Sequence, residues 1–247
     1  MKKSLPFAPV IIFLLLSTVF TTNAQPLRVD FRQAANDDSQ FTLGEVRWRQ
    51  SILQQNNSVY YEGMSVPQRI FFTNIASTRG NEHSLTFSHK ATKSGRHAYD
   101  FLTSYDQATL SAIAIVGPTI LHDLNPCGAD IGPPKSMEQS CTSVRNGPHA
   151  YPVIMPDDMG SLLGHSITGS IKAYEARFRN RELMIYGDKA ISSASLTFNG
   201  YTTGSDATAL YTLTWTSSSS DVLIELAGHL AMGMDVSGAG SGIGYGS

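Results

Sequence analysis

Two adjacent tyrosines and a glutamate stand directly ahead of a β-prone run in NNSVYYEGMSVPQRIFF, residues 56–72. Aromatic rings and carboxylates together suit carbohydrate recognition, because a ring stacks on a sugar face while carboxylate oxygens accept hydrogen bonds from its hydroxyls. This chemistry predicts a surface site in which rings and acids from two segments meet. Its members are Tyr60, Tyr61, Glu62, Tyr105 and Asp106.

The same stretch also has a purely structural interpretation. Gly63 permits a turn, Pro67 suits the first residue of a strand, and Arg69 can reach back to Glu62 or Asp100 as a bidentate pair that locks the corner. A scaffold corner and a glycan site therefore both stay open, with Arg69 and Asp100 among the candidate binding residues.

Acidic residues in or beside the predicted loops suggest calcium, which takes six to eight oxygen ligands, backbone carbonyls included. They are Glu62, Asp100, Asp106, Asp157 and Asp158. The chain lacks the DxDxDG-type loop that identifies a calcium site, so these residues leave calcium binding open. No other cofactor is expected.

A nucleophile and a set of histidines are weaker candidates. GHSITG at 164–169 is close to the GxSxG elbow around Ser166, but its second glycine stands at 169 instead of 168. His83 and His89 lie about 20 Å apart on one predicted strand, too far to share an ion. His229, in an apolar strand, is expected to be a core histidine bonded to backbone.

Cys127 and Cys141 are the only cysteines. In an exported chain they predict one disulfide, which closes a loop of about 15 residues and stabilises it by roughly 3 kcal/mol in the chain-entropy model. The sharper alternative is a metal site made by the two thiols with His122 and Asp123, although the spacing matches no CxxC pattern.

The amino terminus has the features of a secretory signal peptide, with cleavage expected after Ala24. Lys2 and Lys3 precede an apolar run from 10 to 20, which as a helix of about 16 Å is too short to cross a membrane. Residues 1–24 hold two of the 18 basic residues and none of the 20 acidic ones, so the remainder carries a net charge of about −4. We therefore expect a secreted or cell-surface protein without a membrane span and without a nucleic-acid partner.

Period-2 and β-branched segments predict strands along most of the chain. The predicted strands cover 44–53, 68–75, 83–89, 181–187, 194–200, 207–216 and 221–231, and the last two are expected to form a hairpin. Short helices are compatible with 98–113 and 169–182, whereas 116–163 is rich in proline and glycine and is predicted to be a long loop tied by the disulfide.

This pattern predicts an all-β fold, an antiparallel, jelly-roll-like β-sandwich, as a single domain over 25–235. Residues 236–247 alternate glycine with small residues and are predicted to be a flexible tail or linker.

The order of these motifs resembles the amino-terminal module of large secreted, mostly uncharacterised surface proteins of Bacteroidetes-type bacteria. The resemblance covers roughly 41–231 and runs from a strand tryptophan through a Tyr-x-EG-x-S-x-P-x-R corner and a His-Ala-x-Asp segment to a closing Gly-His. The matching residues are Trp48, Tyr60, Glu62, Gly63, Ser65, Pro67, Arg69, Lys93, Gly95, His97, Ala98, Asp100, Leu102, Thr103, Ser104, Tyr105, Gly228 and His229.

The resemblance implies a domain signature and no catalytic residues. We therefore expect a non-enzymatic structural or adhesion module, whose partner is an extracellular glycan or a surface protein. A carbohydrate-binding module is the alternative, and a secreted hydrolase is a distant third.

Overall fold

The computed structural model describes residues 25–38, 41–50, 52–122, 124–128, 135–157 and 160–232. The predicted signal peptide, the glycine-rich tail, Asp123 and Asp158 lie outside these residues. The described chain is mostly β-strand, with three α-helices and two short 3-10 turns, η1 (Arg79–Asn81) and η2 (Pro118–Ile120).

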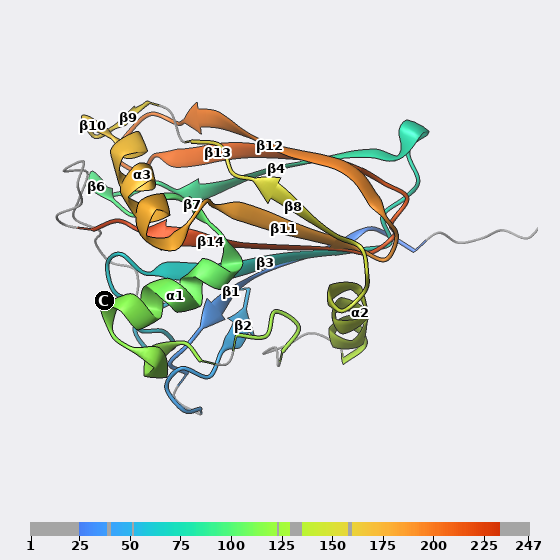
Figure 1. Ribbon diagram of the computed structural model, residues 1–247, viewed down its shortest axis with the longest axis horizontal. Helices are drawn as coiled ribbons and strands as arrows, with labels where there is room; N and C mark the ends of the chain where they lie inside the picture. Colours follow the sequence, from blue (N-terminus) through green and yellow to red (C-terminus); the bar gives the residue numbers. More distant parts are fainter. Residues whose placement is uncertain are drawn as a thin grey trace, which may run out of the picture.

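Two antiparallel sheets pack face to face, as expected from the sequence (Figure 1). The large sheet has the order β2 (Arg47–Arg49), β1 (Arg28–Ala35), β3 (Ser65–Thr73), β14 (Val222–Leu230), β11 (Glu182–Gly187) and β8 (Ala150–Ile154), and β7 (Tyr99–Thr103) also pairs with β14. The small sheet has the order β12 (Ile191–Tyr201), β13 (Thr208–Ser217) and β4 (Glu82–Lys90). Two ribbons of two-residue strands complete the set, β5 (Thr92–Lys93) with β6 (Arg96–His97) and β9 (Ser161–Leu162) with β10 (His165–Ser166). The antiparallel sandwich is thus confirmed.

Strand alternation places the main core between the two sheets. On β3, Ile70 and Phe72 face the small sheet, where the Phe72 ring lies 6.0 Å from that of Trp215, centroid to centroid. Phe71 points to the opposite side of the same strand and packs under a helix. Because both faces of the central strands are covered, β3 and β14 are buried along their whole length.

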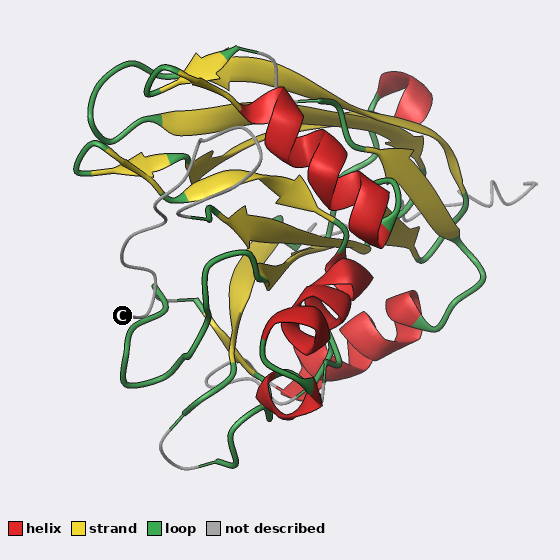
Figure 2. Cartoon of the chain, turned by 60° about the vertical axis from the view of Figure 1, so that its left-hand side comes forward, coloured by secondary structure: helices red, strands yellow, loops and turns green. Residues whose placement is uncertain are grey.

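Three helices lie outside the sandwich (Figures 1 and 2). α1 (Tyr105–Ile115) and α2 (Lys135–Arg145) cover the outer face of the large sheet, and α3 (Ile167–Phe178) packs against β7 and α1. At the start of α1, the Ser104 N–H donates to Gln107 Oε1 at 3.1 Å, one half of a capping box. The two short helices compatible with the sequence are therefore present, at 105–115 and 167–178.

The final two strands do not form the predicted hairpin. β13 pairs with β12 and β4 in the small sheet, whereas β14 pairs with β3, β11 and β7 in the large one. The serine-rich connection at 217–220 thus carries the chain from one sheet to the other. A short polar connection between two apolar strands is compatible with either arrangement, and burial of β14 on both faces decides between them.

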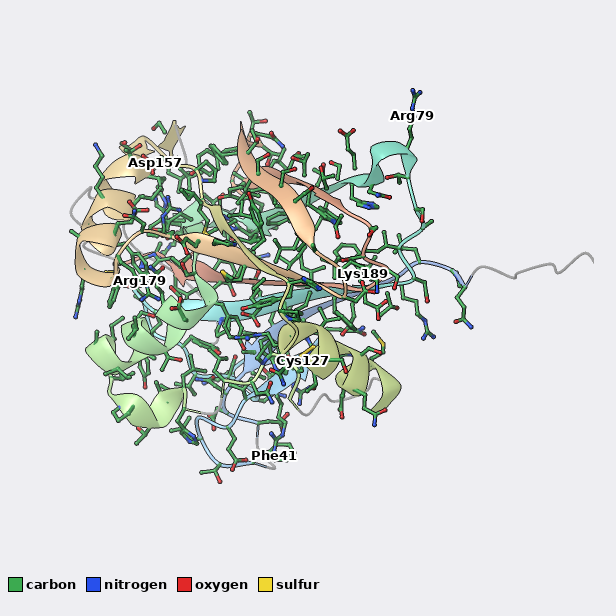
Figure 3. All side chains as sticks on the ribbon, turned by 45° about the vertical axis from the view of Figure 1, so that its right-hand side comes forward. Phe41, Arg79, Cys127, Asp157, Arg179 and Lys189 are labelled. Atoms are coloured by element: carbon green, nitrogen blue, oxygen red, sulfur yellow. A yellow bond between two sulfur atoms is a disulfide. The ribbon has the colours of Figure 1, made fainter. Side chains whose placement is uncertain are left out.

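The disulfide between Cys127 and Cys141 is confirmed, with Cα atoms 5.5 Å apart. Cys141 belongs to α2, and Cys127 lies against this helix in Figure 3. The proline- and glycine-rich section at 116–163 therefore holds α2 and β8 in addition to loops. Both cysteines pack with Phe71 and Leu223, so the bond attaches α2 to the outer face of the large sheet.

Candidate functional site

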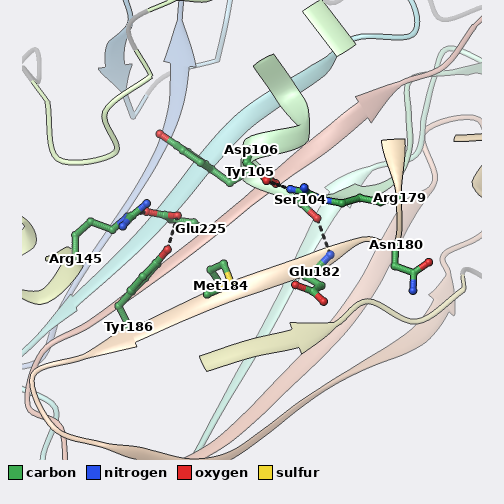
Figure 4. A pocket seen from close by; sticks show the side chains of 10 residues that line it. All are labelled: Ser104, Tyr105, Asp106, Arg145, Arg179, Asn180, Glu182, Met184, Tyr186 and Glu225. Atoms are coloured by element: carbon green, nitrogen blue, oxygen red, sulfur yellow. Dashed lines mark hydrogen bonds and ion pairs between the residues drawn. The ribbon is translucent and has the colours of Figure 1, made fainter. Parts of the chain in front are cut away.

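A pocket with a volume of about 640 Å³ lies on the outer face of the large sheet, and we call it the outer pocket (Figure 4). β11 and β14 form its floor, the start of α1 and the end of α2 form two walls, and the turn that follows α3 forms a third. Its lining residues are Ser104, Tyr105, Asp106, Arg145, Arg179, Asn180, Glu182, Met184, Tyr186 and Glu225.

Glu225 is the buried acid of this pocket, with 2% of its surface exposed. Arg145 Nε donates to one carboxylate oxygen, and the Tyr186 hydroxyl donates to the other at 3.1 Å (Figure 4). Burial raises the pKa of Glu225 above its ordinary value, and the ion pair with Arg145 only partly offsets this effect. The pocket therefore contains a carboxyl group that takes up a proton more readily than an exposed glutamate.

A raised acid pKa makes the stability depend on pH. Between the ordinary glutamate pKa and the raised pKa of Glu225, the folded chain binds more protons than the unfolded chain, so this group's contribution to stability falls as pH rises. Glu225→Gln cannot titrate and keeps an oxygen for Tyr186. We expect the free energy of unfolding of the variant, relative to the parent, to increase with pH across this window. Urea unfolding of both chains at a series of pH values measures this difference in unfolding free energy. A difference that does not change with pH would contradict the raised pKa of Glu225.

Two tyrosine rings form the apolar part of the pocket. The Arg145 guanidinium lies 4.6 Å from the centre of the Tyr186 ring, and the Tyr105 ring stacks on Trp48 with centroids 6.2 Å apart. Burial raises the pKa of both phenols, so they are neutral hydrogen-bonding groups at pH 7. The Tyr105 hydroxyl is buried and has no hydrogen-bond partner among the described residues.

The rim of the pocket is polar and more exposed. Arg179 pairs with Asp106, and the Glu182 N–H donates to Ser104 Oγ at 2.6 Å, which joins β11 to the start of α1. The Glu182 and Asn180 side chains are exposed. Donors, acceptors and two tyrosine side chains thus line one cavity, an arrangement suited to a polyhydroxylated ligand.

Only two of the seven predicted binding residues, Tyr105 and Asp106, line the outer pocket. Tyr61 and Glu62 are exposed in the turn that leads into β3, and they are not among its lining residues. Tyr60 is buried, and its hydroxyl donates to the Ala34 carbonyl at 2.8 Å, so it is a packing residue.

Arg69 and Asp100 are buried in separate polar clusters, so the predicted pair between them is wrong. Arg69 Nη2 donates to Asp30 at 3.3 Å, and Arg69 also donates to the Pro126 carbonyl. Asp100 Oδ1 lies 2.7 Å from His229 Nδ1, and the other oxygen of Asp100 has no hydrogen-bond partner within the described part of the chain. His229 is thus a core histidine as predicted, but the partner of its Nδ1 is a carboxylate and not backbone.

Sequence reasoning missed Glu225, Arg145, Tyr186 and Glu182. One signal was present: Glu225 is a lone carboxylate inside an otherwise apolar strand, VLIELAGHL. Such a residue is expected to have a partner, because an unpaired buried charge is costly. The partner, Arg145, is 80 residues away and belongs to a segment predicted to be loop, so the sequence did not connect the two.

The remaining candidates do not assemble into a site. Ser166 precedes α3 at the end of the antiparallel β9–β10 ribbon, so it lacks the parallel sheet of a nucleophile elbow. The thiols of the proposed metal site are consumed by the disulfide. Among the described residues, no group of three or more His, Cys, Asp or Glu could hold a metal ion.

The calcium candidates are dispersed over the described chain. Asp100 pairs with His229, Asp106 with Arg179, and Asp157 with Arg181, whereas Glu62 is exposed in its turn. A site built largely from backbone carbonyls was not excluded by the sequence, and calcium stays a prediction.

Comparison with protein-family models, curated proteins and solved structures found no match to this chain. The resemblance to Bacteroidetes-type surface proteins therefore stays a prediction. Over the described residues, every helix is too short or too polar to span a membrane.

Proposed function

We propose that this chain is a non-enzymatic adhesion module of an exported bacterial protein and that it binds an extracellular carbohydrate in the outer pocket. This proposal joins the two functions that the sequence favours, because attachment through a glycan is a form of adhesion. It moves the binding site from the Tyr61 corner to the outer pocket.

The observation that carries the proposal is the lining of the outer pocket. Glu182 and Asp106 supply carboxylate acceptors, Arg145 and Asn180 supply donors, and the Tyr186 side chain is part of the floor. Vicinal sugar hydroxyls both donate and accept, so they match such a mixed set. The disulfide supports export, since such bonds persist in oxidising compartments.

A glycan array followed by titration calorimetry tests this function. Glu182→Ala is the variant of choice, because the Glu182 side chain is exposed and only its backbone N–H bonds to Ser104. We expect the fold to be unchanged and the affinity for the strongest glycan to fall roughly tenfold or more, as for the loss of a charged hydrogen bond.

Tyr61→Ala is the matched control, since Tyr61 is an exposed aromatic residue outside the pocket. The control is expected to bind like the parent chain. Loss of binding in Tyr61→Ala with retention in Glu182→Ala would return the site to the corner. Release of shorter sugars from the bound glycan would contradict the non-enzymatic assignment.

A further inference from the structure

Val29 and Phe31 of β1 form an apolar stripe on the inner face of the large sheet, and the small sheet leaves this stripe exposed. In the register of β1 with β3, Val29 is opposite Phe72 and Phe31 is opposite Ile70. Directly opposed residues of an antiparallel pair share a face, so Val29 and Phe31 lie on the face that carries the main core. Yet Val29 is 52% exposed and Phe31 is 40% exposed, whereas Phe72 and Ile70 are buried.

The small sheet ends before it reaches this stripe. β12 packs beside β8 at one margin of the large sheet, and Phe72 of β3 contacts Trp215 of β13. The small sheet therefore crosses the large sheet from the β8 margin toward the β1 margin, in the strand order β12, β13, β4. The outer edge of β4 is thus on the side of β1. Leu85 and Phe87, on the inner face of β4, are only half buried for the same reason.

The outer edge of β4 is a free strand edge. Among the described strands, β4 pairs with β13 alone, over Glu82–Lys90. Exposed edges are commonly protected by charges, proline or bulges. Between its two charged ends β4 has none of these, and its outward side chains are the hydroxyls of Ser84, Thr86 and Ser88. The free backbone groups of such an edge select an extended strand over a helix.

The strand order leaves a place beside β4 where a strand can be added. β1 continues the large sheet past β3, which leaves a step beside β4, and neighbouring strands are about 4.8 Å apart. A second sandwich that docked edge to edge on β4 would meet β1 and β2 with its own large sheet. A single peptide segment meets no such obstacle, and its inward side chains would lie over Val29 and Phe31.

We propose that the edge of β4 binds an extended peptide segment of another protein, which pairs as a fourth strand of the small sheet. Alternate apolar residues of the segment cover Val29 and Phe31 and complete the burial of Leu85 and Phe87. The ends of β4 also set the charge of the segment, since Glu82 lies at one end and Lys90 at the other, both exposed. The segment then bears a basic residue beside Glu82 and an acidic residue beside Lys90. This inference is independent of the outer pocket.

The probe is a fluorescent nine-residue peptide with an initial glutamate, a final lysine and alternating valine and threonine between them. Its charges match the ends of β4 when the two strands pair in antiparallel register. The reverse order of charges, with lysine first, probes the parallel register, and the same residues without alternation are the control. We expect fluorescence anisotropy to show saturable binding of one alternating peptide to the intact chain. Amide hydrogen exchange is expected to slow at 84–88 upon binding.

Phe31→Lys places a charge on the stripe, and we expect it to weaken peptide binding at least tenfold. Ile154→Lys is the matched control, because Ile154 is also an exposed apolar residue, 73% against 40% for Phe31, and lies on β8 at the opposite margin of the large sheet. It should bind like the parent. Equal affinity of Phe31→Lys and Ile154→Lys would overturn the proposal, as would the absence of saturable binding. A dimer of the parent chain in light scattering that Phe31→Lys dissociates would also overturn it, in favour of a second copy as occupant.

Discussion

Replacing Asp30 by alanine is expected to lower the free energy of unfolding by about 3–5 kcal/mol, the usual cost of removing one partner of a buried ion pair. Arg32 Nε donates to the two Asp30 oxygens at 3.0 and 2.8 Å, and Arg69 Nη2 donates at 3.3 Å. Each of the two arginines is 2% exposed. Without Asp30, two buried guanidinium groups lose the carboxylate that they share. Urea unfolding at pH 7 measures the loss.

Asp106→Ala is the control for this substitution, since it removes an acid of the same type from an exposed pair with Arg179. Exposed pairs contribute at most about 1 kcal/mol, because water screens both charges. We therefore expect the control to unfold close to the parent midpoint. Similar losses for Asp30→Ala and Asp106→Ala would mean that the cluster around Arg69 makes no special contribution to stability.

Acidification from pH 7.5 to pH 5 is expected to cost the folded chain about 2 kcal/mol through His89 alone. The His89 ring contacts the rings of Tyr99 and Tyr211, and neither of its nitrogens has a hydrogen-bond partner among the residues that the structure describes. Burial lowers the pKa of His89 from 6.5 to about 3. Between these values the unfolded chain binds a proton that the folded chain does not, so this contribution is present above pH 6.5 and is lost as pH falls.

His89→Phe removes this proton while it keeps an aromatic ring in the same place. We expect the variant to lose about 2 kcal/mol less than the parent between pH 7.5 and pH 5, because other titrating groups contribute equally to both. Urea unfolding at the two pH values gives the difference directly. Identical losses in the two chains would show that His89 is protonated inside the fold.

The two proposed interaction sites use different parts of the sandwich. The outer pocket lies on the helix-covered face of the large sheet, whereas the β4 edge and the Val29–Phe31 stripe belong to the margin where the small sheet ends. A chain with both would bind a glycan and a peptide segment at once, which suits an adhesion module within a larger surface assembly. Phe31→Lys and Glu182→Ala separate the two activities.

The sequence by itself determined the fold class and the cross-link. Period-2 alternation places His83, Leu85 and Phe87 on the inner face of β4, and this depends only on the geometry of a single strand. Two cysteines admit one intramolecular pairing, so the Cys127–Cys141 bond required no knowledge of the fold. The short helices at α1 and α3 were likewise accessible from local composition.

Only the tertiary structure decided which residues share a site. Glu225 and Arg145 are brought together by α2, whose position depends on the disulfide and on packing against Phe71 and Leu223. Asp30, which binds Arg69, is 39 residues from it in the chain. Pairing between distant segments depends on strand register and sheet assignment, and local propensity contains neither. Because local propensity does not contain the sheet assignment, the sequence pattern also did not reveal that β13 and β14 belong to different sheets.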